Sequence, residues 1–211
     1  MKKLTRHSLM AFAAALMLTA CQGKPFQKLA NFTEEATEAT FKVMKSLDDD
    51  LGYREAQEKI AEATKSYAEK AKKIQKDLDG TEIETVATEE TGLTIKKDFT
   101  VSLEEDDYET KLMLYAKAEI GEDAPTNHVS AIGYDGDTPV LILASEYYSD
   151  NDISINKEDG TVSFQLKIDA SNAKQLGTVD KIVLTVDNEL ANKLYEEQRE
   201  REKEMWRDLA D

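Results

Sequence analysis

Acidic residues at two predicted turns form the pattern most similar to a metal site. Asp135 and Asp137 flank a glycine, and Asp150 and Asp152 alternate with other residues as the ligands of a calcium loop do. Calcium binds six to eight oxygen atoms, so two such loops together could supply a site. The EF-hand pattern fails, because isoleucine and threonine replace its sixth-position glycine and twelfth-position glutamate. Turns also favour Asp for backbone reasons, so we expect no cofactor and keep calcium as the alternative.

Three tyrosines near predicted strand ends are the second candidate for binding. Exposed rings of Tyr134, Tyr147 and Tyr148 could stack on a sugar or a peptide. Strand tyrosines also pack on half-buried faces of sheets. A glycan site is therefore the alternative to a structural role for these rings.

The chain contains few residues of the types that commonly act as catalysts. The chain holds two histidines, His7 and His128, and one cysteine, Cys21. No serine lies in a Gly-x-Ser-x-Gly turn, and nine scattered glycines form neither a phosphate-binding loop nor a dinucleotide fingerprint. Among 43 Asp and Glu residues any chosen carboxylate pair is uninformative, so an unrecognised hydrolase is a second alternative. We expect a protein that binds rather than catalyses.

The N-terminal segment carries the most specific motif. A basic start is followed by an apolar run over residues 9–18, which is too short to span a bilayer and typical of a secretory signal. The run leads into Leu18-Thr19-Ala20-Cys21, which resembles the lipobox of bacterial lipoproteins. The resemblance implies cleavage before Cys21 by signal peptidase II, a diacylglycerol on its sulfur and a further acyl chain, such as palmitate, on its amine. An ordinary signal peptide is the alternative, and the resemblance names no family for the rest of the chain.

The residues after Cys21 bear on the location of the anchor. Several acyl chains bind a membrane permanently, whereas one chain binds only marginally. Lipoproteins similar to this one that carry Asp after the cysteine tend to stay in the inner membrane, and this chain has Gln22 there. The acidic run used by some bacteria for surface display is absent from residues 22–25. The resemblance thus implies an outer-membrane lipoprotein that faces the periplasm.

Charge is distributed unevenly along the chain. Loss of residues 1–20 would remove three of the 27 Lys and Arg residues and no acidic residue, which leaves 24 against 43, a net charge of −19. Residues 22–79 are nearly neutral, whereas residues 80–188 hold 8 basic and 23 acidic groups. Such a surface repels nucleic acid and anionic lipid. We therefore expect membrane attachment through the acyl chains, a possible envelope protein as partner, and no nucleic acid.

Helical periodicity dominates the first third of the body. Apolar residues recur every three or four positions over 29–47 and again over 53–78, which predicts two amphipathic helices. A breaker at residues 48–52 joins them into an αα-hairpin, and Asp79-Gly80 ends the second helix. The first helix could begin at Pro25, or later at a capping box of Asn31 and Glu34.

The period changes to two from Thr91 onward. Alternation predicts a long hairpin over 93–120, strands near 128–134 and 140–144, a short strand at 153–155, and strands over 162–168 and 182–186. The 140–144 run is apolar on both faces, which predicts a central strand. About seven strands without intervening helices indicate an antiparallel β-sandwich of immunoglobulin-like architecture.

The final helix is predicted to begin at Asp187 or Asn188 and to be highly charged in its middle. Its apolar ends, including Leu190 and Trp206, could dock on the helical hairpin or on a partner. The predicted fold class is α+β. Its parts are a signal peptide (1–20), an anchor with helical hairpin (21–80), an acidic β-sandwich (81–188) and a C-terminal helix (189–211).

Overall fold

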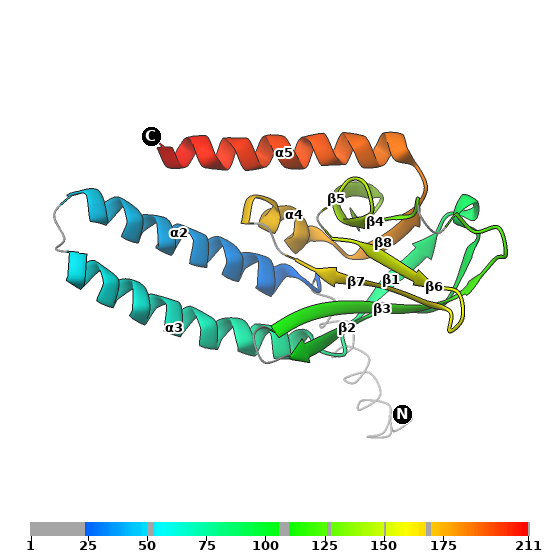
Figure 1. Cartoon of the computed structure of the whole chain (residues 1–211), viewed down its shortest axis with the longest axis horizontal. Helices are drawn as coiled ribbons and strands as arrows, with labels where there is room; N and C mark the ends of the chain where they lie inside the picture. The colour runs from blue at the N-terminus through cyan, green and yellow to red at the C-terminus, as the bar shows by residue number, and fades with distance from the viewer. Residues whose placement is uncertain are drawn as a thin grey trace, which may run out of the picture.

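The computed structural model describes residues 24–49, 53–105, 110–125, 128–149, 151–167 and 170–210. These residues form a mixed α/β fold in which four α-helices surround one curled sheet (Figure 1). The helices are α2 (Gln27–Asp49), α3 (Tyr53–Leu78), α4 (Ala173–Thr178) and α5 (Asn188–Ala210), and two short 3-10 turns are η1 (Glu89–Thr91) and η2 (Ala170–Asn172).

Eight strands form a single sheet with the order β5-β4-β8-β1-β2-β3-β7-β6. The strands are β1 (Glu82–Ala87), β2 (Leu93–Glu105), β3 (Thr110–Ile120), β4 (Ser130–Asp135), β5 (Thr138–Ser145), β6 (Ile153–Asn156), β7 (Thr161–Leu166) and β8 (Lys181–Thr185). Neighbours are antiparallel except for β1 and β8, which pair in parallel. The predicted long hairpin is confirmed as β2 and β3, with Leu103 opposite Leu112.

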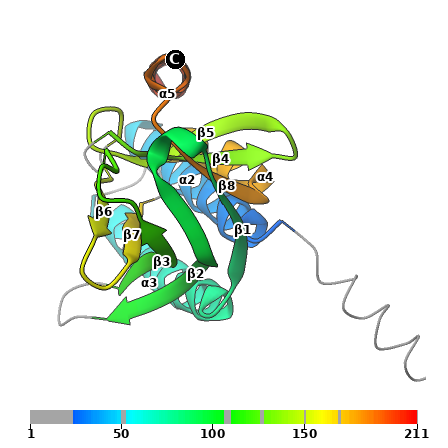
Figure 2. The same ribbon diagram turned by 90° about the vertical axis from the view of Figure 1, so that its right-hand side faces the viewer.

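The predicted sandwich of about seven strands is not confirmed. The strand β1 was not predicted; its inward residues Ile83 and Thr85 alternate with exposed glutamates. No helix was predicted between the last two strands, where η2 and α4 lie. This helical segment carries the chain across the sheet, so that β8 enters between β4 and β1 and joins all strands into one sheet. The result is a half-barrel rather than two facing sheets (Figure 2).

Helices supply the part of the core that a second sheet would have supplied. The main apolar cluster combines inward sheet residues with residues from the start of α2, the end of α3 and the α4 segment. At its centre the rings of Phe99 and Phe164 meet edge to face, with centroids 5.1 Å apart. α4 packs closely on α2 at Gly177, where an added Cβ would lie 2.9 Å from the Cβ of Ala30.

The helical hairpin is confirmed, and its start agrees with the earlier of the two predictions. Lys24, Pro25 and Phe26 form a turn that leads directly into α2, and the Gln27 amide donates to the Lys24 carbonyl at 3.1 Å. Asn31 therefore lies inside the helix, not at its cap. α3 ends at Leu78 and is followed by Gly80, whose positive φ of 79° suits glycine. Of the predicted breaker 48–52, Asp48 and Asp49 belong to α2, and residues 50–52 lie outside the described residues.

The run 140–144 is a strand, but its predicted central position is wrong. β5 forms one edge of the sheet. It is apolar on both faces because Leu141 and Leu143 face the main core, whereas Ile142 packs under α5 against Ala191 and Leu194. A side chain also covers its outer edge, since the Ile142 amide donates to Oε1 of Gln198 at 2.7 Å. The helix thus substitutes for a neighbouring strand.

α5 begins at its predicted cap. The Asp187 carboxylate accepts the amides of Glu189 and Leu190, both at 3.0 Å. The helix docks on β5 and η2 rather than mainly on the helical hairpin. Toward its other end Trp206 remains 58% exposed. One apolar end is therefore in the core and the other is on the surface.

Candidate functional site

A lysine clamp fixes the first described residue to the sheet. The Lys24 ammonium donates to the carboxylates of Asp135 and Asp180, the latter at 3.2 Å, and to the Thr178 carbonyl at 2.7 Å. Asp135 ends β4, Thr178 ends α4, and Asp180 lies between α4 and β8. Two residues later Phe26 is fully buried in the main core. The chain is thus held from both sides where it enters the fold.

The charges in the clamp support one another. The hydrogen bond to Asp135 and the interactions with Asp180 raise the pKa of Lys24, although desolvation opposes them. For Asp180, burial acts to raise the pKa, but the Gly136 amide, Lys24 and Lys181 outweigh it and lower the pKa. The Gly136 amide donates to Asp180 at 3.0 Å, in the turn where glycine adopts a φ of 59°. Lys24 and Asp180 therefore both stay ionised over a wide pH range.

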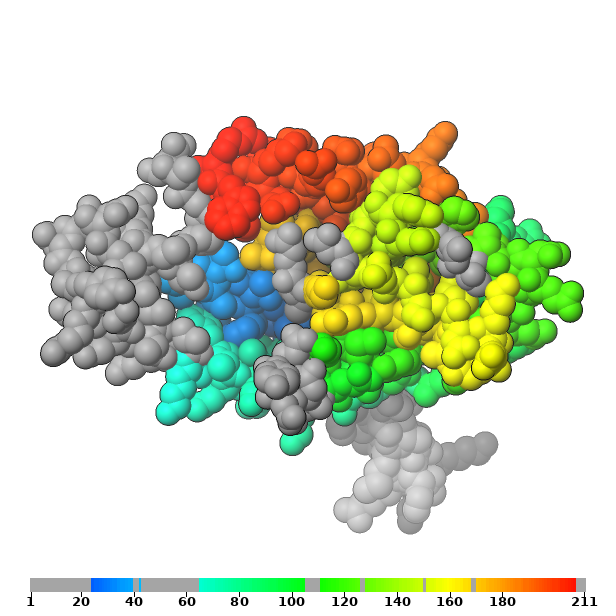
Figure 3. Space-filling model, in the orientation of Figure 1, coloured from blue at the N-terminus to red at the C-terminus, as the bar shows by residue number. Residues whose placement is uncertain are grey.

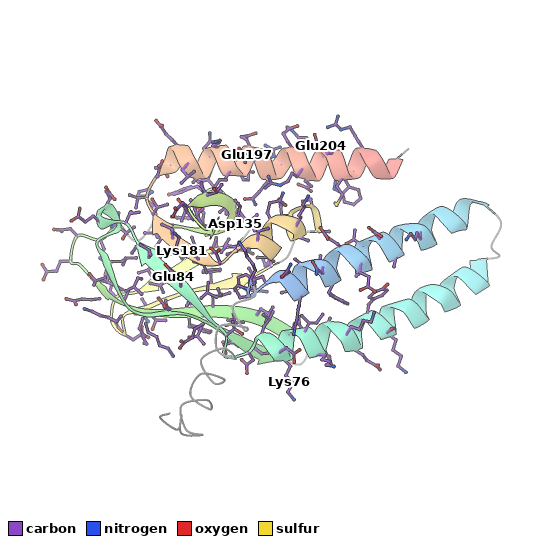
Figure 4. All side chains as sticks on the ribbon, turned by 180° about the vertical axis from the view of Figure 1, so that it is seen from behind. Lys76, Glu84, Asp135, Lys181, Glu197 and Glu204 are labelled. Atoms are coloured by element: carbon purple, nitrogen blue, oxygen red, sulfur yellow. The ribbon has the colours of Figure 1, made fainter. Side chains whose placement is uncertain are left out.

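A cleft of about 920 Å³ opens beside this clamp. Its walls come from the start of α2, the end of α3, β1, the β4–β5 turn and the start of β8. Figure 4 shows this face, with Glu84, Asp135 and Lys181 lying close together on neighbouring elements. Lysines and carboxylates both line the cleft: Lys24, Lys28, Lys181, Asp77, Glu82, Glu84, Asp137 and Asp180. Such a surface can contact ligand groups of either charge.

The structure places the predicted calcium residues apart or beside lysines. Asp135 is paired with Lys24, and Asp137 lies 3.6 Å from the ammonium of Lys181. Asp152 is exposed just before β6, and Asp150 lies outside the described residues. No three acidic, His or Cys side chains within the described part of the chain are grouped as metal ligands. At the β4–β5 turn, Asp135 and Asp137 thus each lie beside a lysine ammonium group.

The three candidate tyrosines do not form one site. Tyr134 and Tyr148 are half-buried against the small apolar cluster beneath α5, and the Tyr148 ring lies 6.2 Å from that of Tyr195. Tyr147 is 58% exposed and stacks on His128, with centroids 5.7 Å apart. Of the three rings, Tyr147 is the one that a ligand could cover.

The Lys24 clamp was not predicted from the sequence. Lys24 and Asp180 are separated by 156 positions, and their pairing depends on β8 entering the middle of the sheet. The local signal was Pro25, which favours an early start for the first helix and so places Lys24 at the edge of the fold. Nothing in the spacing of the acidic residues marks Asp180 as its partner.

Comparison with known proteins adds no family to this description. No protein-family model matches the chain, and no match was found among curated proteins or solved structures. None of the helices formed by the described residues has the length and hydropathy needed to cross a membrane.

Proposed function

We propose that this protein is a lipid-anchored lipoprotein of the bacterial cell envelope that acts by binding or interaction, without catalysis. Its anchor is the acylated Cys21, and its location is the periplasmic face of the outer membrane. The observation that carries the proposal is the short distance in sequence between the lipobox and the folded body. Phe26, five residues after Cys21, is fully buried in the core. Cleavage before Cys21 would therefore remove the leader and leave the whole core intact.

The anchor would hold the body close to the bilayer. Gln22 and Gly23 are the residues between Cys21 and the clamped Lys24, and the three steps from Cys21 to Lys24 reach about 10 Å when extended. Lipoproteins with long linkers can act far from the membrane, but a link of this length keeps the folded body close to the bilayer. The function supported best is therefore interaction at or near the membrane surface.

Replacement of the acylated sulfur tests the proposal. In cells given labelled palmitate, we expect the parent protein to take up label and to sediment with the outer membrane, and Cys21→Ser to do neither. Thr19→Ser is the matched control, since it keeps a small residue in the lipobox and should behave as the parent does. Mass spectrometry of the parent N-terminus should show an acylated Cys21. A Cys21→Ser protein that sediments with membranes as the parent does would exclude this function.

A glycan-binding role is a second candidate because one observation favours it. Tyr147 and His128 form an exposed stacked pair to which a sugar ring could add. If this pair binds glycans, Tyr147→Ala should abolish binding in a glycan titration and Tyr148→Ala should not. Equal binding by the parent and Tyr147→Ala would exclude the pair.

A partner protein in the envelope is the other form that the interaction can take. The exposed Trp206 on α5 supports this possibility, because large apolar side chains at the surface are enriched in interfaces. Crosslinking in cells should capture a partner with the parent and lose it with Trp206→Ala. A parent protein that crosslinks to nothing would argue against an envelope partner.

A further inference from the structure

We propose that the cleft beside the Lys24 clamp is the surface by which this protein contacts the membrane, and that zwitterionic phospholipid headgroups of the anchoring leaflet occupy it. The proposal rests on the proposed function, since it requires the acyl chains on Cys21. It adds an orientation and an occupant, neither of which follows from acylation alone.

The length of the tether determines the orientation. The acyl chains lie in the hydrocarbon core, and the headgroup layer on each side of a bilayer is about 5–8 Å thick. A reach of about 10 Å from Cys21 to Lys24 is mostly used in crossing this layer. Lys24 cannot swing away from the body, because three acceptors hold its ammonium and Phe26 is fully buried. The residues around Lys24 must therefore lie against the headgroups.

The cleft lies where this contact would form. Lys24 and Pro25 line its wall, and Lys28 follows one helical turn later. Figure 2 shows the start of α2 together with β1 on one side of the molecule and β6 with β7 on the other. The space-filling view from the β7 side shows the face that would point away from the bilayer (Figure 3). The face formed by the start of α2 and β1 thus lies near the anchor, and the face formed by β6 and β7 lies on the opposite side of the molecule.

The charges of the cleft favour a zwitterionic occupant. Lys28 has no ion-pair partner among the described residues and could bind a phosphate, while Glu84, equally without such a partner, could bind an ammonium group. A headgroup such as phosphocholine or phosphoethanolamine carries both charges. An anionic headgroup layer would instead be repelled by the acidic block of residues 80–188. Increased anionic lipid should therefore weaken the contact.

Single-cysteine labelling tests the orientation. Cys21 is the only cysteine and is acylated under the proposed function, so an introduced cysteine gives a unique label. The test pair is Glu82→Cys in the cleft and Glu158→Cys in the β6–β7 turn, both exposed glutamates. Each acylated, processed variant carries a thiol-reactive fluorophore and is inserted into phosphatidylcholine vesicles. Quenching is then measured with nitroxide-labelled phosphatidylcholine, bearing the nitroxide on the headgroup or deep in the acyl chain.

We expect the headgroup nitroxide to quench the label at residue 82 severalfold more than the label at residue 158. The deep nitroxide should quench both labels weakly. Replacement of part of the phosphatidylcholine by phosphatidylglycerol at low salt should reduce the quenching at residue 82. Equal quenching at the two positions, or stronger quenching at residue 158, would overturn the orientation, and an increase with phosphatidylglycerol would overturn the zwitterionic occupant.

The failures of the two proposals can be told apart. Flotation with vesicles and the mass of the acylated N-terminus report on the anchor before any label is attached. If the parent is not acylated, the proposed function fails. If the labelled variants float and unfold at the parent temperature but show equal quenching, the anchor stands and the membrane-facing cleft is wrong.

Discussion

Replacement of Phe26 by alanine tests whether the chain folds from its first described turn. The Phe26 side chain is fully buried in the main core, although it precedes α2 and follows Cys21 by five residues. Loss of a buried phenylalanine ring typically costs about 3–5 kcal/mol of unfolding free energy, because apolar contacts are lost and a cavity remains. In a chain of this size each kcal/mol lowers the melting temperature by about 2–4 °C. We therefore expect a decrease of about 6–20 °C.

Phe32→Ala is the matched control for this experiment. Phe32 lies within α2, close to Phe26 in sequence, but is only partly buried, with its ring centroid 5.9 Å from that of Tyr67. Its loss should cost about 1–2 kcal/mol. Urea unfolding followed by far-UV circular dichroism gives both free energies, with equal m-values as the check on two-state behaviour. If Phe26→Ala costs no more than Phe32→Ala, the turn before α2 is not part of the core, and the short tether loses its basis.

Other substitutions test the clamp, the helix contact and the covered edge. Lys24→Met should cost about 1 kcal/mol near neutral pH, because these side chains are partly exposed and solvent screens them. The lowered pKa of Asp180 and the raised pKa of Lys24 confine this effect, so in urea titrations the difference should hold between pH 3.8 and 10.5 and shrink below and above; a difference that does not decrease as the pH falls below 3.8 would contradict the ion pairs of the clamp. Gly177→Ala forces a Cβ against α2 and should lower stability by about 1–3 kcal/mol in the same assay, whereas an unchanged midpoint would mean that α4 does not pack so closely. Gln198→Ala removes the acceptor for the Ile142 amide, so hydrogen exchange at that amide should accelerate while exchange in β2 does not.

Local signals in the sequence were sufficient for most elements. The helical hairpin, the β2–β3 hairpin and the cap of α5 follow from residue spacing and from Asp187, and the structure contains all three. Each of these features is decided by neighbours in the chain, which a single sequence displays directly. Spacing also placed the β4–β5 turn correctly at Asp135–Asp137.

The order of the strands could not be predicted in the same way. A run that is apolar on both faces indicates burial on both sides but does not say whether a strand or a helix covers its edge. In β5 the cover is α5 through Gln198, so the run 140–144 lies at the sheet edge. The contact of Asp135 could not be predicted for the same reason, because its partner Lys24 lies 111 positions away. The pairing arises only when α2, β4 and β8 meet.

The Lys24 clamp forms only through the long-range packing of α2, β4 and β8, and the proposed position at the membrane depends on this clamp. A folded body on a long flexible linker would sample many orientations at the membrane. A body whose clamped turn begins three positions after the anchored cysteine can adopt few orientations. If the cleft faces the headgroups, the helical hairpin does not point into the periplasm. Figure 1 shows α2 and α3 projecting beyond the sheet. In Figure 2 the same helices run away from the viewer, whereas the line from β6 and β7 to the start of α2 runs across the picture, so the hairpin does not project along that line. At 1.5 Å per residue α3 is about 39 Å long, so the hairpin would extend the contact sideways along the leaflet. A partner that binds the hairpin would then have to lie in or on the same membrane, whereas one that binds β6 and β7 could approach from the periplasm.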